Sequence, residues 1–337
     1  MNKFEKFKKA LSSEYSENII LNLSPSSSFR NRCEFSYSNN AYVMHDNDQK
    51  IYMNTFSFAS SAIQKKMPNL LEIVNSSKII KNKLFQINFR SNRENDVLVT
   101  LIYHKKIDTL LIEAINDVSK KINIKFIIRS KNYIHIFDEE LFEDKLKFKD
   151  LKIYQTDNCF FQPNRYLFNR MIAKVIDIIE EPKDLLELYC GVGTFTLPLS
   201  YVFNKVLATE NNRKADKCLK KGILENKISN INSVRLSSDE VVELFDGRIF
   251  RRMKDIDLSL YNFSHILIDP PRSGLTNDII DLLRLFKNII YISCNPDSYL
   301  RDLTMLSDYE IKKIEVFDQF PNTDHLEIVS ILTKKNY

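Results

Sequence analysis

Short apolar runs alternate with helical patterns through the second half of the chain, and this alternation constrains the fold more than any other feature. The runs DLLEL, KVLAT, SHILI and NIIYIS have the length and apolar character of buried strands. Apolar residues recur at helical spacing before the first run, between the second and third, and between the third and fourth. Such alternation predicts an α/β fold with a Rossmann-like, doubly wound and mostly parallel sheet. The closing pair, KKIEVFDQF and HLEIVSILT, predicts that the last strand runs antiparallel.

Glycine is rare in this chain, so its positions are informative. The chain of 337 residues has five glycines and none before Gly191, where average usage would give about 24. Gly191 and Gly193 follow the first apolar run in YCGVGTF, and Gly274 lies in DPPRSGL. Glycines that occur in such short segments indicate tight turns or a close approach of the backbone to a ligand.

Several polar residues fall where the predicted strands end. The loop 189–195, Glu210, Asp269 and Cys294 all lie there, and doubly wound sheets bind ligands at that edge. Thr196 stands where the dinucleotide fingerprint has its third glycine, which disfavours an NAD site without excluding it. Glu210, at the end of the second strand, is placed to accept hydrogen bonds from a ribose diol. A cofactor with a ribose and no phosphates fits this pattern, and S-adenosylmethionine is such a cofactor.

Cys294 ends a predicted buried strand, directly before an Asn-Pro turn. Most free cysteines are small buried apolar residues, and that alternative applies here. A thiolate at this edge can instead add to carbon 6 of a pyrimidine and make carbon 5 nucleophilic toward a methyl donor. A carboxylate must then remove the proton from carbon 5 so that the thiolate can leave. Glu327 opens the last strand and is the candidate base if that strand is antiparallel; a solvated strand residue is the alternative.

The motifs together resemble those of the RNA 5-methyluridine methyltransferase family, and within it the enzymes that act on tRNA. The resemblance rests on FFQPN, LLELYCGVGTF, LATE, DPPRSGL, YISCNP and FDQFPNTDHLE. It extends through FRNRCEF, KLFQINF and LIYHKKID, and so covers nearly the whole chain. Related ribosomal RNA enzymes usually carry an iron-sulfur cysteine cluster and often a small N-terminal β-barrel, and this sequence has neither pattern. The resemblance implies methylation of the T-loop uridine at tRNA position 54 by S-adenosylmethionine, which gives 5-methyluridine.

The resemblance also implies roles for individual residues. Cys294 matches the nucleophile and Glu327 the general base. The positions expected to hold S-adenosylmethionine are Gln162, Tyr189, Gly191, Gly193, Thr194, Glu210 and Asp269. Thr194 stands where the family usually has Asn, which puts one contact in doubt without removing the site. No metal is expected, because the five cysteines are scattered and contain no CxxC pair.

The first half of the chain is the expected RNA-binding part. We expect an α+β RNA-binding domain over residues 1–155 and the catalytic methyltransferase domain over residues 156–337. Residues 1–150 hold 24 Lys and Arg against 18 Asp and Glu, a net charge of +6, while the whole chain carries +5. An ordinary Lys-rich surface is the alternative explanation of this excess.

Aromatic and basic residues interleave in this half, as RNA-stacking surfaces with phosphate partners do. A T-loop uridine is stacked and paired within folded RNA, so the enzyme must extrude it at a cost of a few kcal/mol. Our hypothesis is that Arg30, Phe85 and His104 contact the RNA. The alternative is that Phe85 and Tyr103 are inward-facing strand residues.

Three functions remain open from the sequence. The first is the tRNA enzyme, with transfer-messenger RNA as a further substrate left open. The second is a ribosomal RNA uridine methyltransferase without an iron-sulfur cluster, and the third is a non-enzymatic RNA chaperone on the same fold. No apolar run approaches the ~18 residues of a membrane span, and the N-terminus lacks a signal-peptide centre. We therefore expect a cytoplasmic protein without membrane contact, and a monomer.

Overall fold

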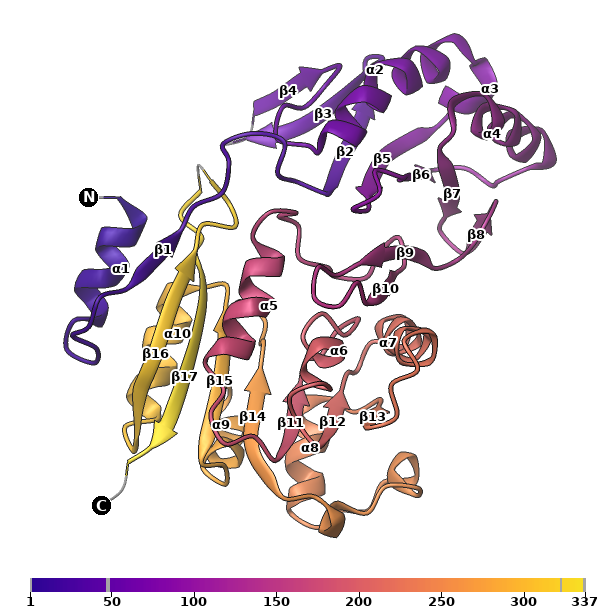
Figure 1. Ribbon diagram of the computed structural model, residues 1–337. Helices are drawn as coiled ribbons and strands as arrows, with labels where there is room; N and C mark the ends of the chain where they lie inside the picture. The colour runs from indigo at the N-terminus through magenta and orange to yellow at the C-terminus, as the bar shows by residue number, and fades with distance from the viewer. Residues whose placement is uncertain (1, 47–48, 322, 336–337) are drawn as a thin grey trace.

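The computed structural model describes residues 2–46, 49–321 and 323–335. Figure 1 shows two larger sheets with a two-stranded sheet between them. Strands β11, β12, β14 and β15 run parallel and end toward the N-terminal part of the molecule. Their carboxyl ends therefore face the space between the two halves of the chain.

The C-terminal sheet has eight strands in the order β1-β16-β17-β15-β14-β11-β12-β13. Its strands are β1 (Ile20–Asn22), β11 (Asp184–Leu188), β12 (Lys205–Thr209), β13 (Ile231–Val234), β14 (Phe263–Ile268), β15 (Asn288–Ser293), β16 (Tyr309–Phe317) and β17 (Glu327–Lys334). The last strand, β17, runs antiparallel to both β15 and β16, between which it lies. The predicted mostly parallel sheet with an antiparallel last strand is confirmed.

Helices cover both faces of this sheet, as expected of a doubly wound fold. They are α5 (Phe168–Asp177), α6 (Thr196–Leu199), α7 (Arg213–Glu225), α8 (Ser238–Phe245), α9 (Asn277–Leu283) and α10 (Pro296–Met305), with 3-10 turns η1 (Arg251–Met253) and η2 (Leu258–Leu260). Two separate apolar cores result. One packs α5 and α7 on one face, with Met171 and Leu219 among its buried residues. The other packs α9 and α10 on the opposite face, with Ile279 and Tyr299.

The N-terminal sheet has seven strands in the order β4-β3-β2-β5-β6-β7-β8. Its elements are β2 (Arg32–Ser38), β3 (Ala41–Asp46), β4 (Gln49–Met53), α2 (Ser61–Ser76), α3 (Lys78–Lys81), β5 (Leu84–Ser91), β6 (Val97–Tyr103), α4 (Thr109–Ile122), β7 (Lys125–Ser130) and β8 (Tyr133–Ile136). Helices α2 and α4 and the sheet share one apolar core. Strands β9 (Phe142–Lys145) and β10 (Lys152–Gln155) form the small sheet between the two halves.

The first residues of the chain pack on the C-terminal sheet. Helix α1 (Lys3–Leu11) buries Phe7 and Leu11 in the same core as Tyr299, and β1 pairs in parallel with β16. The domain bounds 1–155 and 156–337 stay a prediction, but α1 and β1 pack with the C-terminal sheet rather than with the N-terminal one. Helix α1 packs there because it buries apolar side chains: Phe7 and Leu11 are at most 3% exposed. Across the described part of the chain, no helix is both long and apolar enough to cross a membrane.

Candidate active site

Cys294 and Glu327 lie at the same end of two paired strands. In the antiparallel pair β15 and β17, Ser293 stands opposite Ile328. The next residue in each direction is Cys294 on one strand and Glu327 on the other, so the register places them side by side. Glu327 is 2% exposed and Cys294 is partly buried. The predicted proximity of these two residues is therefore found in the structure.

The turn after Cys294 is built by the start of α10. Asn295 is the N-cap residue of this helix, and its side-chain oxygen accepts a hydrogen bond from the Asp297 N–H (3.1 Å). Pro296 occupies the first helical position, where its missing N–H leaves no intrahelical bond unmade. The Asn-Pro pair thus ends the strand sharply and fixes the backbone that carries the thiol.

Acidic groups with raised pKa values meet at this edge. Burial, and then the charges of Glu327 and Asp269, raise the pKa of Cys294 to about 11, although Arg272 acts in the opposite direction. Burial raises the pKa of Asp269 to about 7. Burial and then Asp269 hold the pKa of Glu327 well above its ordinary value. The site therefore favours protonated groups by itself, and a cation bound beside them would favour their ionised forms.

The glycine loop after β11 has backbone conformations that favour glycine. Gly193 has φ +93°, and a Cβ there would lie 2.5 Å from Leu219 Cδ1 on α7. Gly191 has φ +56° with nothing within 4 Å of a built Cβ, so space remains beside the loop. Tyr189, at φ +59°, is a non-glycine residue in the left-handed region. Thr194 is 8% exposed, within the same loop.

Glu210 connects this loop to the next strand. Its Oε2 accepts a hydrogen bond from the Gly191 N–H (2.9 Å), and its Oε1 accepts one from the Asn212 N–H (2.7 Å). Each carboxylate oxygen has two lone pairs, so both can accept a further hydrogen bond from a ligand. The structure thus brings Glu210 and the glycine loop together at the edge where both were expected to lie.

Gln162 lies beside the segment that leads into Glu327. Its side-chain oxygen accepts a hydrogen bond from Gln319 Nε2 (3.3 Å), and its backbone oxygen accepts one from Asn31 Nδ2 (3.3 Å). Gln319 follows β16, whose last residue, Phe317, pairs with Glu327. The structure therefore brings the FFQPN segment to the edge that carries Cys294 and Glu327.

Two buried polar residues of this region were not singled out from the sequence. Glu187 is 1% exposed and Gln319 is fully buried, and each has a side-chain oxygen with no hydrogen-bond partner among the described residues. Burial, with a smaller contribution from Asp269, raises the pKa of Glu187 to about 8. A buried polar atom without a partner costs stability, so each of these oxygens is a group to which a bound ligand can donate a hydrogen bond. The available signal was an acid inside an apolar strand directly before the glycine loop.

Lys3 holds the segment that precedes Glu327. Its ammonium donates to Asp318 Oδ1 (2.6 Å) and to the backbone oxygens of Phe320 (3.1 Å) and His325 (2.9 Å). These three hydrogen bonds use all three ammonium donors. Helix α1 thereby tethers both ends of the segment 318–325. The sequence does not indicate this role, because Lys3 is one of four lysines in a short Lys-rich helix.

The proposed RNA contacts fall into two places. Phe85 and His104 stack with their ring centroids 4.1 Å apart and the planes at 17°. They line a groove of about 790 Å³ that also includes Tyr133. The alternative that Phe85 is an inward-facing strand residue is wrong, because its side chain is 42% exposed. The same alternative is right for Tyr103, which is 1% exposed and whose hydroxyl donates a hydrogen bond to Ile80 O (2.9 Å).

Arg30 lines a different cavity, to which the segment that leads into Glu327 also contributes. It lines a cavity of about 440 Å³ together with Phe56, Phe58 and Phe320. Phe320 belongs to the segment 318–325, which leads into Glu327. In residues 2–46, 49–321 and 323–335 no three His, Cys, Asp or Glu side chains are grouped to hold a metal ion.

Comparisons with known proteins agree with this architecture over most of the chain. The family model described as tRNA (Uracil-5-)-methyltransferase matches residues 1–335. A tRNA/tmRNA (uracil-C(5))-methyltransferase of Campylobacter lari is 41% identical over 331 residues, which cover 95% of this chain and 94% of the relative. A protein of the same name from Nitratiruptor is 40% identical and covers 92% of this chain and 88% of the relative.

A solved structure has the same fold. It is the tRNA (uracil-54, C5)-methyltransferase of Pyrococcus abyssi in complex with S-adenosyl-L-homocysteine, which superposes with a TM-score of 0.77. The superposition covers 98% of this chain and 83% of that chain, at 23% sequence identity. At this identity the likeness establishes the fold alone, and it confirms the predicted fold class.

Proposed function

The chain belongs to the tRNA (uracil-5-)-methyltransferase family, and from this premise we propose that it methylates carbon 5 of the T-loop uridine at position 54 of tRNA. The observation that carries the proposal is the placement of Cys294 beside Glu327 at the carboxyl edge of the parallel strands. A thiol paired with a carboxyl base is what methylation at a pyrimidine carbon requires. Transfer-messenger RNA is proposed as a second substrate, because the relatives from Campylobacter and Nitratiruptor have both RNAs in their names.

We propose S-adenosylmethionine as the methyl donor, because its chemistry matches the edge. The donor supplies an electrophilic methyl group and carries positive charge. Glu187, Asp269 and Glu327 are carboxyls whose pKa values are raised. A cation among them lowers those pKa values and so relieves the cost of their burial. Glu210 accepts hydrogen bonds from the ribose diol.

The remaining proposed cofactor contacts surround this position. Tyr189, Gly191, Gly193 and Thr194 form the loop that approaches the donor, and Gln162 closes the site from the segment before α5. Gly191 leaves room beside the loop, since a Cβ built there meets nothing within 4 Å. The close packing of Gly193 on Leu219 then keeps the loop in its conformation.

The two proposed catalytic residues act in sequence on the uracil ring. Cys294 adds as thiolate to carbon 6, and the electron pair of the 5,6 double bond moves toward carbon 5 and the carbonyl oxygen at carbon 4. Carbon 5 forms its bond to the methyl group as the bond from that methyl to the donor sulfur breaks. Glu327 takes the proton from carbon 5, the bond from sulfur to carbon 6 breaks, and the double bond and the thiolate are restored. The positive donor favours the ionised forms of both residues.

Unmodified tRNA transcript incubated with the protein and methyl-labelled S-adenosylmethionine should acquire label in 5-methyluridine at position 54. Parallel reactions with transfer-messenger RNA and with ribosomal RNA show whether other RNAs are substrates. Nucleoside mapping by mass spectrometry locates the label. If label appears only in ribosomal RNA, the substrate is ribosomal RNA and not tRNA. If no RNA acquires label, the protein is an RNA-binding protein without this activity.

His104→Ala should raise the Michaelis constant for tRNA while leaving S-adenosylmethionine binding intact. We propose that Arg30, Phe85 and His104 contact the RNA, and the exposed Phe85–His104 stack offers a flat surface for an unstacked base. Stacking of one base contributes about 1–3 kcal/mol, so its loss should raise the constant by roughly 5- to 150-fold. Tyr133→Phe, in the same groove, is a control that keeps the ring. Unchanged tRNA kinetics for His104→Ala would contradict the contact.

A further inference from the structure

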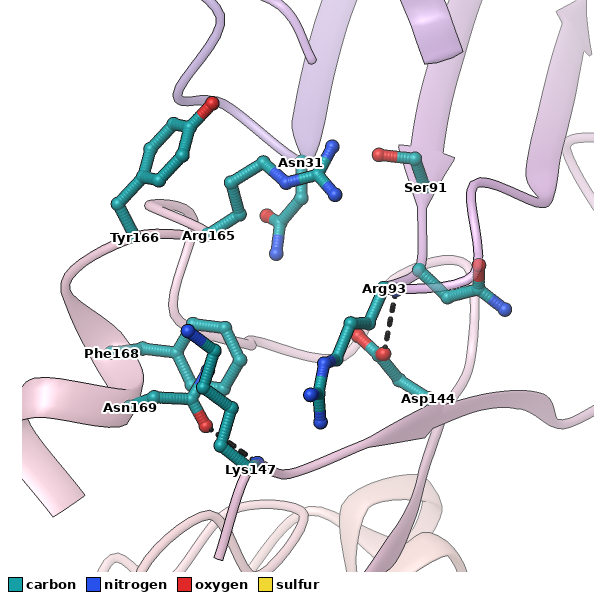
Figure 2. A pocket seen from close by; sticks show the side chains of 10 residues that line it. Asn31, Ser91, Arg93, Asp144, Lys147, Arg165, Tyr166, Phe168 and Asn169 are labelled. Atoms are coloured by element: carbon teal, nitrogen blue, oxygen red, sulfur yellow. Dashed lines mark hydrogen bonds between the residues drawn. The ribbon is translucent and has the colours of Figure 1, made fainter. Parts of the chain in front are cut away.

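A second, positively charged cleft lies between the two halves of the chain, and Asn31, which donates to Gln162 O, is among its lining residues. Figure 2 shows it from close by, with Ser91 at the end of β5, Arg93 in the turn after that strand, and Arg165 and Tyr166 in the segment before α5. Its volume is about 220 Å³, which is large enough for a phosphate group with its first waters. We call it, together with the adjoining cavity described below, the interdomain cleft.

The charges of this cleft are poorly compensated. Arg93 has one carboxylate partner among the described residues, the exposed Asp150 at 3.3 Å. Arg165 meets only the side-chain oxygen of Asn95, at 3.4 and 3.5 Å, and the Lys147 ammonium has no partner in the described part of the chain. The one acid that lines the cleft, Asp144, accepts hydrogen bonds from backbone N–H groups. Three cations against one carboxylate leave a concave surface of positive potential.

Helix α5 adds to this potential. The helix has ten residues and begins at the cleft, with Phe168 and Asn169 in the lining. Its N-cap residue, Leu167, makes no side-chain capping hydrogen bond. The amino end of a helix carries partial positive charge, which favours an anion beside it.

The adjoining cavity extends the positive surface along α5. It has a volume of about 490 Å³ and shares Lys147, Tyr166 and Asn169 with the first cavity. It adds Arg170, whose side chain has no ion pair among the described residues, and no acidic residue lines it. Tyr166 is 44% exposed between the two cavities. A continuous path with four basic residues and one exposed aromatic ring suits a polyanion of several phosphates better than a single small anion.

We propose that the interdomain cleft binds the phosphate backbone of the tRNA substrate, as a contact separate from the Phe85–His104 groove. This inference rests on the proposed function, since it takes tRNA as the polyanion. Arg93 lies in the turn between β5 and β6 of the N-terminal half, and Arg165 and Arg170 belong to the second half of the chain. One RNA strand in the cleft therefore contacts both halves at once and holds them in one arrangement while the uridine is extruded.

The test is the salt dependence of tRNA binding by Lys147→Gln/Arg170→Gln. Both side chains are exposed and lack partners among the described residues, so their replacement should leave the fold intact. We expect the Kd for tRNA to rise about tenfold near 0.15 M salt. The plot of the logarithm of the association constant against the logarithm of the salt concentration should become less steep, by about 2 in the magnitude of its negative slope. Arg251→Gln/Lys254→Gln is the matched control. It removes the same charge from two exposed residues that line neither cavity, and should change neither quantity.

Three further measurements separate the possible failures. S-adenosylmethionine binding and the thermal midpoint of Lys147→Gln/Arg170→Gln should equal those of the wild type, which excludes misfolding. A Kd and a salt slope equal to those of the control variant would overturn the cleft proposal. If the wild type itself neither binds nor methylates tRNA, the proposed function fails; if it does both and only the cleft variant is unaffected, the cleft inference alone fails.

Discussion

Cys294→Ala is expected to abolish methyl transfer to tRNA, with a loss of at least about 10⁴-fold in kcat, while tRNA and S-adenosylmethionine still bind. The reason is chemical. Carbon 5 of uracil is a poor nucleophile until a thiolate adds to carbon 6. The strand register places the Cys294 thiol beside Glu327, whereas Cys190, in the glycine loop at the same edge, is buried. The measurement is single-turnover transfer of labelled methyl groups to tRNA, with binding of both substrates measured separately.

The control for this loss is a cysteine with no place at the edge. Cys33→Ala removes the same sulfur atom from the core of the N-terminal sheet, where Cys33 is 3% exposed. It should cost stability of about 1 kcal/mol and keep full transfer per folded molecule. Transfer by Cys294→Ala at the wild-type rate would remove covalent addition from the mechanism and return Cys294 to the role of a small buried side chain.

The parts of the fold that sequence could predict are those set by local patterns. The apolar runs became β11, β12, β14 and β15 because buried parallel strands need continuous apolar sequence. The antiparallel β17 was expected from the chain order, and its register with β15 places Glu327 beside Cys294. The glycine loop was expected because so few glycines occur elsewhere, and Gly193 has no room for a Cβ.

The parts that sequence could not predict depend on contacts between distant residues. Strand β1 has three residues and pairs with β16, almost 300 positions later, so no local pattern marks it. Lys3 tethers the segment before Glu327 through oxygens of that segment, and Lys-rich helices are usually solvated. The interdomain cleft combines residues from β5, β9 and α5, and its charge becomes visible only when these elements meet.

Two buried polar residues of the candidate site also have properties that the sequence alone could not predict. Glu187 and Gln319 lie in motifs that the sequence marks as informative, yet their isolation from hydrogen-bond partners is a property of the packed structure. An acid between apolar strand residues is visible in the sequence. That the pKa of Glu187 rises to about 8 follows from burial and from Asp269, which directly follows another strand, β14.

Glu327→Gln is expected to stop turnover and to leave the protein covalently linked to methylated tRNA. The amide keeps the shape of the carboxyl but cannot accept the proton from carbon 5. Addition of Cys294 and methyl transfer still proceed, whereas elimination of the thiolate requires that proton to leave. The adduct should appear as a slower band on a denaturing gel that contains label from both the RNA and the methyl group, with turnover reduced at least about 10³-fold.

The Glu327→Gln substitution should leave the fold intact, so an adduct formed by this variant reports on the chemistry. Burial and then the charge of Asp269 hold the pKa of Glu327 well above its ordinary value, so the folded protein favours the neutral carboxyl. The amide of Glu327→Gln keeps this side chain uncharged. For the wild type, an acid whose folded pKa is raised above its unfolded value loses stability as pH rises between the two values. Glu327→Gln lacks that loss, so its thermal midpoint should equal the wild-type value below about pH 4 and exceed it increasingly as the pH rises above the ordinary pKa of 4.5.

Two further variants decide whether the trapped species is the proposed one. Cys294→Ala/Glu327→Gln should form no adduct, because the attacking sulfur is gone. Glu310→Gln replaces an exposed carboxyl of β16 and should turn over like the wild type. An adduct that contains RNA label without methyl label would show that Glu327 acts before methyl transfer, not after it. Release of 5-methyluridine at the wild-type rate by Glu327→Gln would assign proton removal to another base, and Asp269, whose charge acts on Glu327, is the candidate.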